Sequence, residues 1–167
     1  FEGAKLTITN LQASNHSSGA CGGAISLQST NLDIKNAVIE KVDAVEGGAT
    51  CCFGSQIDAK NLTVRKGNSS LNGGGVNGIL CKVYLEKSVF EQCQSASKGG
   101  AFSLSLSSSL SAEKSTFKNN IAVLDGGAGY ADTIKLVRIF NSTFAENVAA
   151  RGGAMRMKHT KFTTHTS

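Results

Sequence analysis

The sequence predicts an all-β fold, a single-stranded right-handed parallel β-helix of about six coils with about 26 residues in each coil. Three observations predict it. A pair of adjacent glycines recurs at a nearly constant spacing, and short segments of alternating apolar and polar residues recur in phase with the pairs. No segment shows a helical stripe together with caps, so strands are expected throughout.

The glycine pairs recur 25, 26, 26, 27 and 26 residues apart. The six pairs are Gly22-Gly23, Gly47-Gly48, Gly73-Gly74, Gly99-Gly100, Gly126-Gly127 and Gly152-Gly153. Glycine accepts a positive φ and leaves room where two backbones approach closely. Each pair is therefore expected to form a corner of a coil.

The alternating segments start 26, 25, 26, 27 and 27 residues apart. They are residues 6–10, 32–36, 57–61, 83–87, 110–114 and 137–141. A period of two predicts a half-buried strand. The alternation resumes after each glycine pair, where Phe102 and Leu104 are expected to point into the rod and Ser103 and Ser105 out of it. About 26 residues is too short for a βαβ unit or a propeller blade, and fits one coil of three short strands separated by bends.

Two further sets of positions recur in register with the strands. The first holds Ala13, Ile39, Val64, Phe90, Phe117 and Phe144, and the second, three residues later, holds His16, Val42, Gly67, Cys93, Asn120 and Asn147. Equivalent residues of successive coils stack about 4.8 Å apart. Phe90, Phe117 and Phe144 are therefore expected to stack ring on ring, and Asn120 and Asn147 to satisfy the backbone at a bend.

The Gly-Gly-Ala-[Ile/Leu/Val] and Phe-x-x-Asn repeats resemble those of the chlamydial polymorphic outer-membrane proteins and related β-helix surface proteins. The segment Gly22-Gly23-Ala24-Ile25 fits the first motif fully, and residues 117–120 and 144–147 fit the second. The resemblance covers nearly the whole chain. It implies a surface-displayed passenger domain that acts in adhesion to host cells.

Length and composition limit the alternatives. Residues 1–167 are expected to form one β-helix domain, a piece of a longer chain because Phe1 already lies inside a repeat. The net charge is +5, but the lysines are dispersed and no aromatic-rich basic motif is present, so no specific nucleic-acid partner is expected. No apolar run reaches the roughly 18 residues of a membrane span.

The candidates for catalysis and metal binding are few. Asp33 and Asp58 fall at the same outward position of adjacent coils, but a stacked carboxylate pair is also typical of a surface charge ladder. Lys60 and Glu86 are expected to pair across two coils. The histidines, His16, His159 and His165, are scattered. We therefore expect no catalytic residues, no metal site and no cofactor.

Cysteines and glycosylation signals leave several possibilities open. The chain has five cysteines, an odd number that forbids complete internal pairing. If a disulfide exists, Cys51 or Cys52 with Cys81 is the first pairing to test. N-glycosylation signals begin at Asn15, Asn61, Asn68 and Asn141. Asn61 and Asn141 lie at an expected bend, where an inward orientation would hide them.

The first functional hypothesis is a non-enzymatic extracellular or cell-surface rod that acts in adhesion or protein interaction. Its partner would be a protein or glycan on a cell surface. One alternative is a structural stalk or filament component that contacts neighbouring structural subunits. The other is a carbohydrate-active β-helix enzyme, which three or more acidic or arginine side chains converging on one face would favour.

Overall fold

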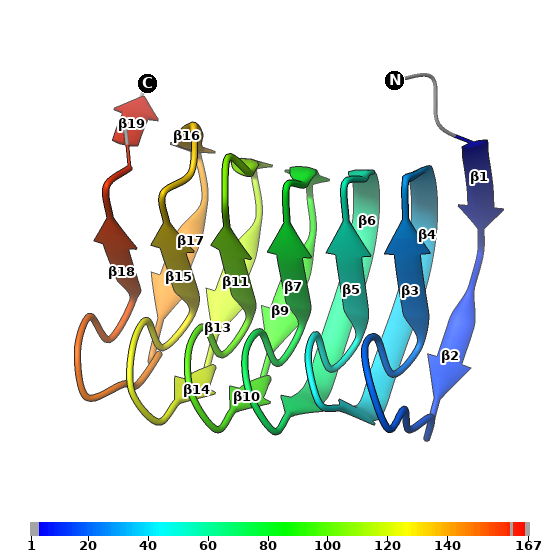
Figure 1. Ribbon diagram of the computed structural model, residues 1–167, viewed down its shortest axis with the longest axis horizontal. Helices are drawn as coiled ribbons and strands as arrows, with labels where there is room; N and C mark the ends of the chain where they lie inside the picture. The colour runs from blue at the N-terminus through cyan, green and yellow to red at the C-terminus, as the bar shows by residue number, and fades with distance from the viewer. Residues whose placement is uncertain (1–3, 161, 166–167) are drawn as a thin grey trace.

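The computed structural model of the protein is a β-solenoid whose coils lie side by side along one axis (Figure 1). It describes residues 4–160 and 162–165, and within these ranges every regular element is a strand. The N-terminal coil forms one end of the rod and the C-terminal coil the other (Figure 1). The predicted all-β parallel solenoid is confirmed.

Two parallel sheets run along the rod. The six-stranded sheet contains β3 (Ile25–Gln28), β5 (Thr50–Phe53), β7 (Val76–Ile79), β11 (Phe102–Ser105), β15 (Gly129–Asp132) and β18 (Met155–Lys158). The 13-stranded sheet contains β1 (Ala4–Thr9), β2 (Gln12–Ser14), β4 (Thr30–Ala44), β6 (Gln56–Ser69), β8 (Lys82–Glu86), β9 (Val89–Glu91), β10 (Gln94–Ser95), β12 (Ser109–Glu113), β13 (Thr116–Lys118), β14 (Ile121–Ala122), β16 (Leu136–Phe140), β17 (Thr143–Ala145) and β19 (Phe162–His165).

The strand register follows the columns read from the sequence. Leu32 pairs with Ile57, and Val83 pairs with Leu110, so equivalent residues of adjacent coils are direct neighbours. Two details differ from the prediction of three strands in each coil. The strands β4 and β6 continue through the corners at Asn36 and Asn61, so their coils have two strands. Coils in the middle of the rod carry a fourth, two-residue strand, β10 or β14, after the strand that holds the phenylalanine.

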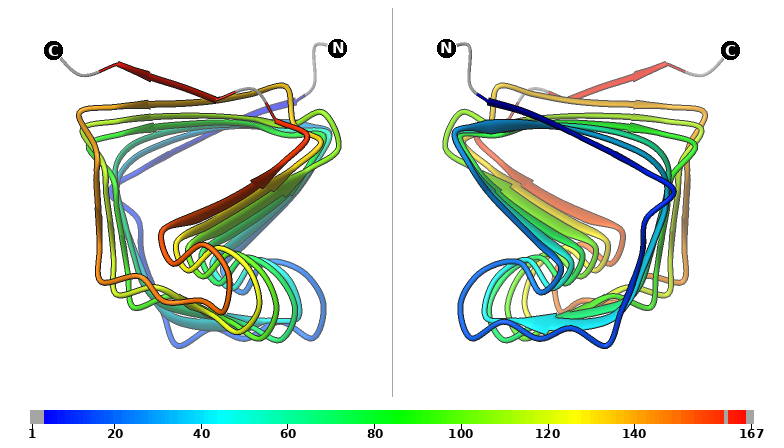
Figure 2. Two further views of the ribbon diagram at one scale, coloured as in Figure 1. Left: turned by 90° about the vertical axis from the view of Figure 1, so that its left-hand side faces the viewer. Right: turned by 90° about the vertical axis from the view of Figure 1, so that its right-hand side faces the viewer.

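The end views establish the hand of the solenoid (Figure 2). In the left view, where the C-terminal end faces the viewer, the chain turns counter-clockwise as it advances toward the viewer. This is the right-handed sense, as predicted from the general preference of parallel crossovers.

Each coil turns at residues with a positive φ, most of which are not glycine. Asn36, Lys87 and Gln92 have φ values of 50°, 50° and 56°. A left-handed conformation costs a non-glycine residue about 1–2 kcal/mol. Hydrogen bonds between coils offset this cost, because corner N–H groups such as those of Lys87 and Gln92 each donate to a carbonyl of the next coil.

The core consists of the side chains that point inward from both sheets, and it includes Leu32, Ile34, Val83, Phe102 and Leu104. The outward side of the six-stranded sheet is also covered, since the loops that precede the glycine pairs curl back beside it (Figure 2). Ser103 points out of its coil as expected, yet only 5% of it is exposed.

Candidate functional site

The glycine pairs occupy coil-to-coil contacts. The first glycine of each pair has a positive φ, which is 67° at Gly99. The second has no room for a side chain, because a Cβ on Gly100 would overlap the main-chain oxygen of Gly127 and lie 2.6 Å from the nitrogen of Ile121. The pairs therefore shape the backbone rather than cradle a ligand.

The phenylalanine column is a stack inside the rod. Ring centroids lie 5.5 Å apart for Phe90 and Phe117 and 4.7 Å apart for Phe117 and Phe144, with interplanar angles of 13° and 16°. Phe102 meets Phe117 edge-on at 5.5 Å. Phe90 and Phe117 are fully buried, so these rings stabilise the core and are not available to a partner.

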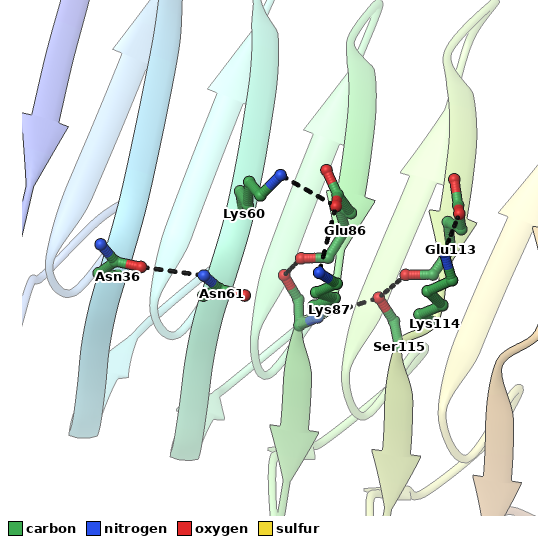
Figure 3. Close-up of polar contacts among 9 residues, drawn as sticks. Asn36, Lys60, Asn61, Glu86, Lys87, Glu113, Lys114 and Ser115 are labelled. Carbon is green, nitrogen blue, oxygen red and sulfur yellow. Dashed lines mark hydrogen bonds and ion pairs between the residues drawn. The ribbon is translucent and has the colours of Figure 1, made fainter.

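The asparagines of the Phe-x-x-Asn motif form an internal ladder. The side-chain Nδ2 of Asn120 donates to the carbonyl of Phe90, and that of Asn147 donates to the carbonyl of Phe117. A second ladder, which was not predicted, lies at another corner, where Ser115 accepts from the main-chain nitrogen of Ser88 at 3.1 Å (Figure 3). Its sequence signal is a serine after the corner residue in three successive coils, at Ser88, Ser115 and Ser142.

Two disulfides connect adjacent coils. One joins Cys52 to Cys81, with 6.4 Å between the Cα atoms. It is one of the two pairings that the sequence suggested testing first. The other joins Cys21 to Cys51, with 5.5 Å between the Cα atoms, and was missed. Cys93 is free and buried, and burial raises the pKa of its thiol to about 12.

The glycosylation signals lie mostly on the surface. Asn15, Asn61 and Asn141 are exposed, so Asn61 and Asn141 do not take the inward orientation that would have hidden them. Both adopt a left-handed corner conformation whose side chain points away from the core. The amide of Asn61 donates to Asn36 Oδ1 at 3.0 Å (Figure 3), and half-buried Asn68 donates to Asp43 Oδ1 at 2.9 Å.

The broad outer face of the 13-stranded sheet carries the predicted acidic column. Asp33 of β4 and Asp58 of β6 are direct neighbours in register. They border a shallow hollow of about 300 Å³, here called the outer-face hollow. Its lining includes Asp33, Asp58, Lys60, Tyr84, Glu86 and Glu113.

One ion pair among the described residues crosses this hollow between coils. Lys60 Nζ lies 3.0 Å from Glu86 Oε1, which confirms the expected cross-strand pair (Figure 3). The hydrogen bond from Lys60 lowers the pKa of Glu86 below its usual value. Glu86 therefore remains ionised at neutral pH, and it is a charged contact rather than a proton donor.

Every other carboxylate of the hollow also has a donor. Asp33 pairs with Lys35 at 3.1 Å, and Glu113 pairs with Lys114 at 3.0 Å. Asp58 accepts a hydrogen bond of 2.7 Å from Gln56. Four acids thus share one face, which meets the condition of three or more that would favour the enzyme alternative. A lysine pairs with three of them, and the fourth, Asp58, is held by the neutral amide of Gln56. The arrangement suits recognition of a polar surface better than acid–base chemistry.

Potential metal ligands meet at one place within the described residues. Cys21, Glu46 and Cys51 have their ligand atoms within 4.8 Å of one another. The disulfide between the two cysteines removes both thiolates, and a single carboxylate does not hold a metal ion. His16 is exposed and His159 contacts Asp132, while the side chain of His165 lies outside the described part.

Comparisons with protein-family models, with curated proteins and with solved structures found no match to this chain. The structure defines the class, a parallel β-solenoid with stacked interior ladders and an open, charged outer face. Among the described residues there is no helix that could cross a membrane.

Proposed function

We propose that this protein is a non-enzymatic β-solenoid rod at the cell surface or outside the cell, which binds a protein or glycan partner through the outer-face hollow. One observation carries the proposal. Tyr84 stands on a flat sheet face, 42% exposed, and charged residues of both signs surround it. Tyrosine is enriched where protein surfaces make their strongest contacts, because its ring is amphipathic and rigid.

An extracellular location is supported by the cysteines. Four of the five form disulfides between successive coils. Such bonds persist in oxidising compartments and are rare in the cytosol. The exposed glycosylation signals are compatible with the same location.

The motif resemblance supports an adhesive role, as in the chlamydial polymorphic outer-membrane proteins. The motif residues themselves, however, do not form the binding surface. Gly100, Phe117 and Asn120 are all buried in this chain. A partner cannot reach them on the folded rod. We infer that adhesion would use the outward columns that the motifs hold in place.

Binding of the purified chain to cultured animal cells tests the proposal. Saturable, dose-dependent binding is expected, and Tyr84→Ser should weaken it about tenfold through loss of one buried aromatic contact. Phe53→Ser is the matched control, since Phe53 is a similarly exposed aromatic (48%) on the six-stranded sheet. Absence of saturable binding, or equal binding by Tyr84→Ser and the native chain, would contradict the proposal.

A stalk or filament role remains the second candidate. It is favoured by the inward columns at the two ends of the described rod, where Leu6, Met155 and Met157 keep part of their apolar surface exposed. A further coil stacked on either end would cover them. Assembly measured by analytical ultracentrifugation, without binding to cells, would favour this role over adhesion.

A further inference from the structure

The residue that precedes each glycine pair belongs to a continuous column, here called the pre-glycine column. Its members are Cys21, Glu46, Asn72, Lys98, Asp125 and Arg151. Parallel bridges join neighbouring members, such as Asn72 with Lys98 and Lys98 with Asp125. The loops that carry this column curl beside the outward side of the six-stranded sheet (Figure 2).

The sheet residues that face this column are withdrawn from solvent although they point out of the core. The exposed fractions of Asn77, Ser103 and Tyr130 are 5%, 5% and 4%. A groove of about 220 Å³ lies between these residues and the column. We call it the loop groove, and its lining includes Glu46, Asn72, Asn77, Lys98, Ser103 and Tyr130.

Covalent and ionic links occupy the positions just beyond each end of the groove. Toward the N-terminal end, the disulfide between Cys21 and Cys51 ties the column to the sheet. Toward the C-terminal end, Arg151 donates to both carboxylate oxygens of Asp125 at 2.7 and 3.0 Å. The groove is therefore a site of defined length in the middle coils, not a channel along the whole rod.

Several polar groups of the groove are already oriented. Asn77 Nδ2 donates to Glu46 Oε2 at 3.1 Å, and the Tyr130 hydroxyl donates to Asp132 Oδ2 at 2.9 Å. Burial and the Asp132 carboxylate raise the pKa of Tyr130 to about 12, so its hydroxyl keeps its proton. Lys98 Nζ lies 4.8 Å from the centre of the Tyr130 ring. These contacts fix the walls before any ligand arrives.

Two polar groups beside the groove have no partner within the described residues. Asn72 Oδ1 is unpaired but sealed from solvent, whereas the Ser103 hydroxyl makes no hydrogen bond and belongs to a groove-lining residue that is 5% exposed. Buried polar groups in native structures seldom lack a partner without a reason. A ligand in the groove would supply one to the Ser103 hydroxyl.

The groove excludes several kinds of ligand. A peptide strand finds no free backbone, because the carbonyls of Asn72, Lys98 and Asp125 all accept from glycines of the preceding coil. An anion meets the carboxylates of Glu46 and Asp132, and a divalent cation meets the ammonium of Lys98. A neutral ligand with several hydroxyl groups avoids both conflicts and can hydrogen-bond to the polar walls.

We propose that the loop groove binds one neutral sugar residue, either free or at the end of a glycan, with hydroxyls hydrogen-bonded to Ser103 and Glu46. The groove is smaller than the roughly 300 Å³ at which pockets for drug-sized ligands begin, which fits a single ring. The inference does not rest on the proposed function, because a sugar site here is compatible with either an adhesive rod or a stalk.

Saturation-transfer NMR of the full chain with mannose, galactose and N-acetylglucosamine tests the site. At least one sugar should bind, and Ser103→Val should weaken it about tenfold by removing one hydrogen-bonding group from a buried contact. Ser103→Tyr should abolish binding by filling the groove with the residue found one coil further on, at Tyr130. Ser26→Val is the matched control, since Ser26 belongs to the same column beyond the Cys21–Cys51 disulfide.

Unfolding curves of each variant establish that it is folded before its binding is compared. Failure of all three sugars to bind the native chain would overturn the proposal. Binding that survives unchanged in folded Ser103→Tyr would also overturn it, because the sugar would then lie elsewhere. Binding of calcium ions or of an unstructured peptide at the groove, in place of a sugar, would show that the ligand class is wrong.

Discussion

Asn147 Oδ1 accepts two hydrogen bonds from Asn120, one from its main-chain nitrogen and one from its side-chain Nδ2, both 3.0 Å long. The same geometry recurs one coil earlier, where Asn120 Oδ1 accepts from the main-chain nitrogen of Cys93 at 3.0 Å. Side chains thus continue the hydrogen bonding between coils at a bend, inside the rod. This explains why the motif requires an amide, which both donates and accepts.

Replacement of Asn120 by alanine should destabilise the fold by about 2–4 kcal/mol, because it leaves the buried main-chain nitrogen of Cys93 without an acceptor and opens a cavity. Urea unfolding at equilibrium measures the change. Gln94→Ala is the control, since Gln94 is an exposed polar residue of the adjacent strand β10. Equal stability of the two variants would show that the side-chain amide of Asn120 does not stabilise the ladder.

Cys93 occupies the position at which an asparagine would extend this ladder by one coil. Its sulfur already lies 3.8 Å from the carbonyl of Val64, which is the contact that an amide Nδ2 would take. Cys93→Asn should therefore retain stability to within about 1 kcal/mol, whereas Cys93→Leu should lose more because its larger side chain overpacks the core. Thermal unfolding compares the two variants. A larger loss for asparagine than for leucine would contradict the ladder.

Stability should fall as the pH rises from 9 toward 12. The folded pKa of Cys93 is raised from 9.0 to about 12, so the native thiol keeps a proton that the unfolded chain releases. The contribution is complete below pH 9 and is lost as the pH rises to 12, by at most about 1.4 kcal/mol per pH unit. Cys93→Ala should flatten the fall between pH 9 and 10, where the unfolded thiol ionises more fully than the unfolded Tyr130, whose pKa rises from 10.0 to about 12 on folding. An unchanged slope would show that the thiol is not protected in this way.

The register of the core was predictable because two periods combine. Side chains alternate between the two faces of a strand, and the coil repeat places equivalent residues of successive coils next to one another. Phe90, Phe117 and Phe144 were therefore expected to stack. The Asp33 and Asp58 column and the Lys60–Glu86 pair followed from the same argument.

The curl of the pre-glycine loops was not predictable in the same way. The same holds for the left-handed corners at residues such as Leu80, Lys87 and Gln92, whose side chains have no preference for that conformation. Hydrogen bonds between coils impose it. The curl brings Cys21 to Cys51 and covers Ser103, so the second disulfide and the loop groove follow from tertiary contacts alone.

Replacement of Phe117 by alanine should cost about 3–5 kcal/mol, because the ring is fully buried between two stacked neighbours and the coils cannot collapse into the space. Phe53→Ala should cost less than about 1 kcal/mol, since its ring is about half exposed. Urea unfolding of both variants tests the difference. A loss under about 1 kcal/mol for Phe117→Ala would show that the stack contributes little.

Replacement of Gly100 by valine should prevent stable folding. The new Cβ would overlap the main-chain oxygen of Gly127, and main-chain atoms of an adjacent coil cannot move aside without breaking hydrogen bonds to the coils beyond. Two controls separate space from conformation. Gly19 has nothing within 4 Å and no positive φ, so Gly19→Ala should leave the melting temperature unchanged.

Gly54 has space around it but a φ of 57°, so Gly54→Ala should cost about 1–2 kcal/mol, the strain of the left-handed conformation alone. Circular dichroism with thermal melting ranks the three variants. The order expected is Gly19→Ala, Gly54→Ala and then Gly100→Val, from mild to severe. If Gly100→Val melted near Gly54→Ala, the second glycine of each pair would be needed for its backbone angles rather than for the close approach of successive coils.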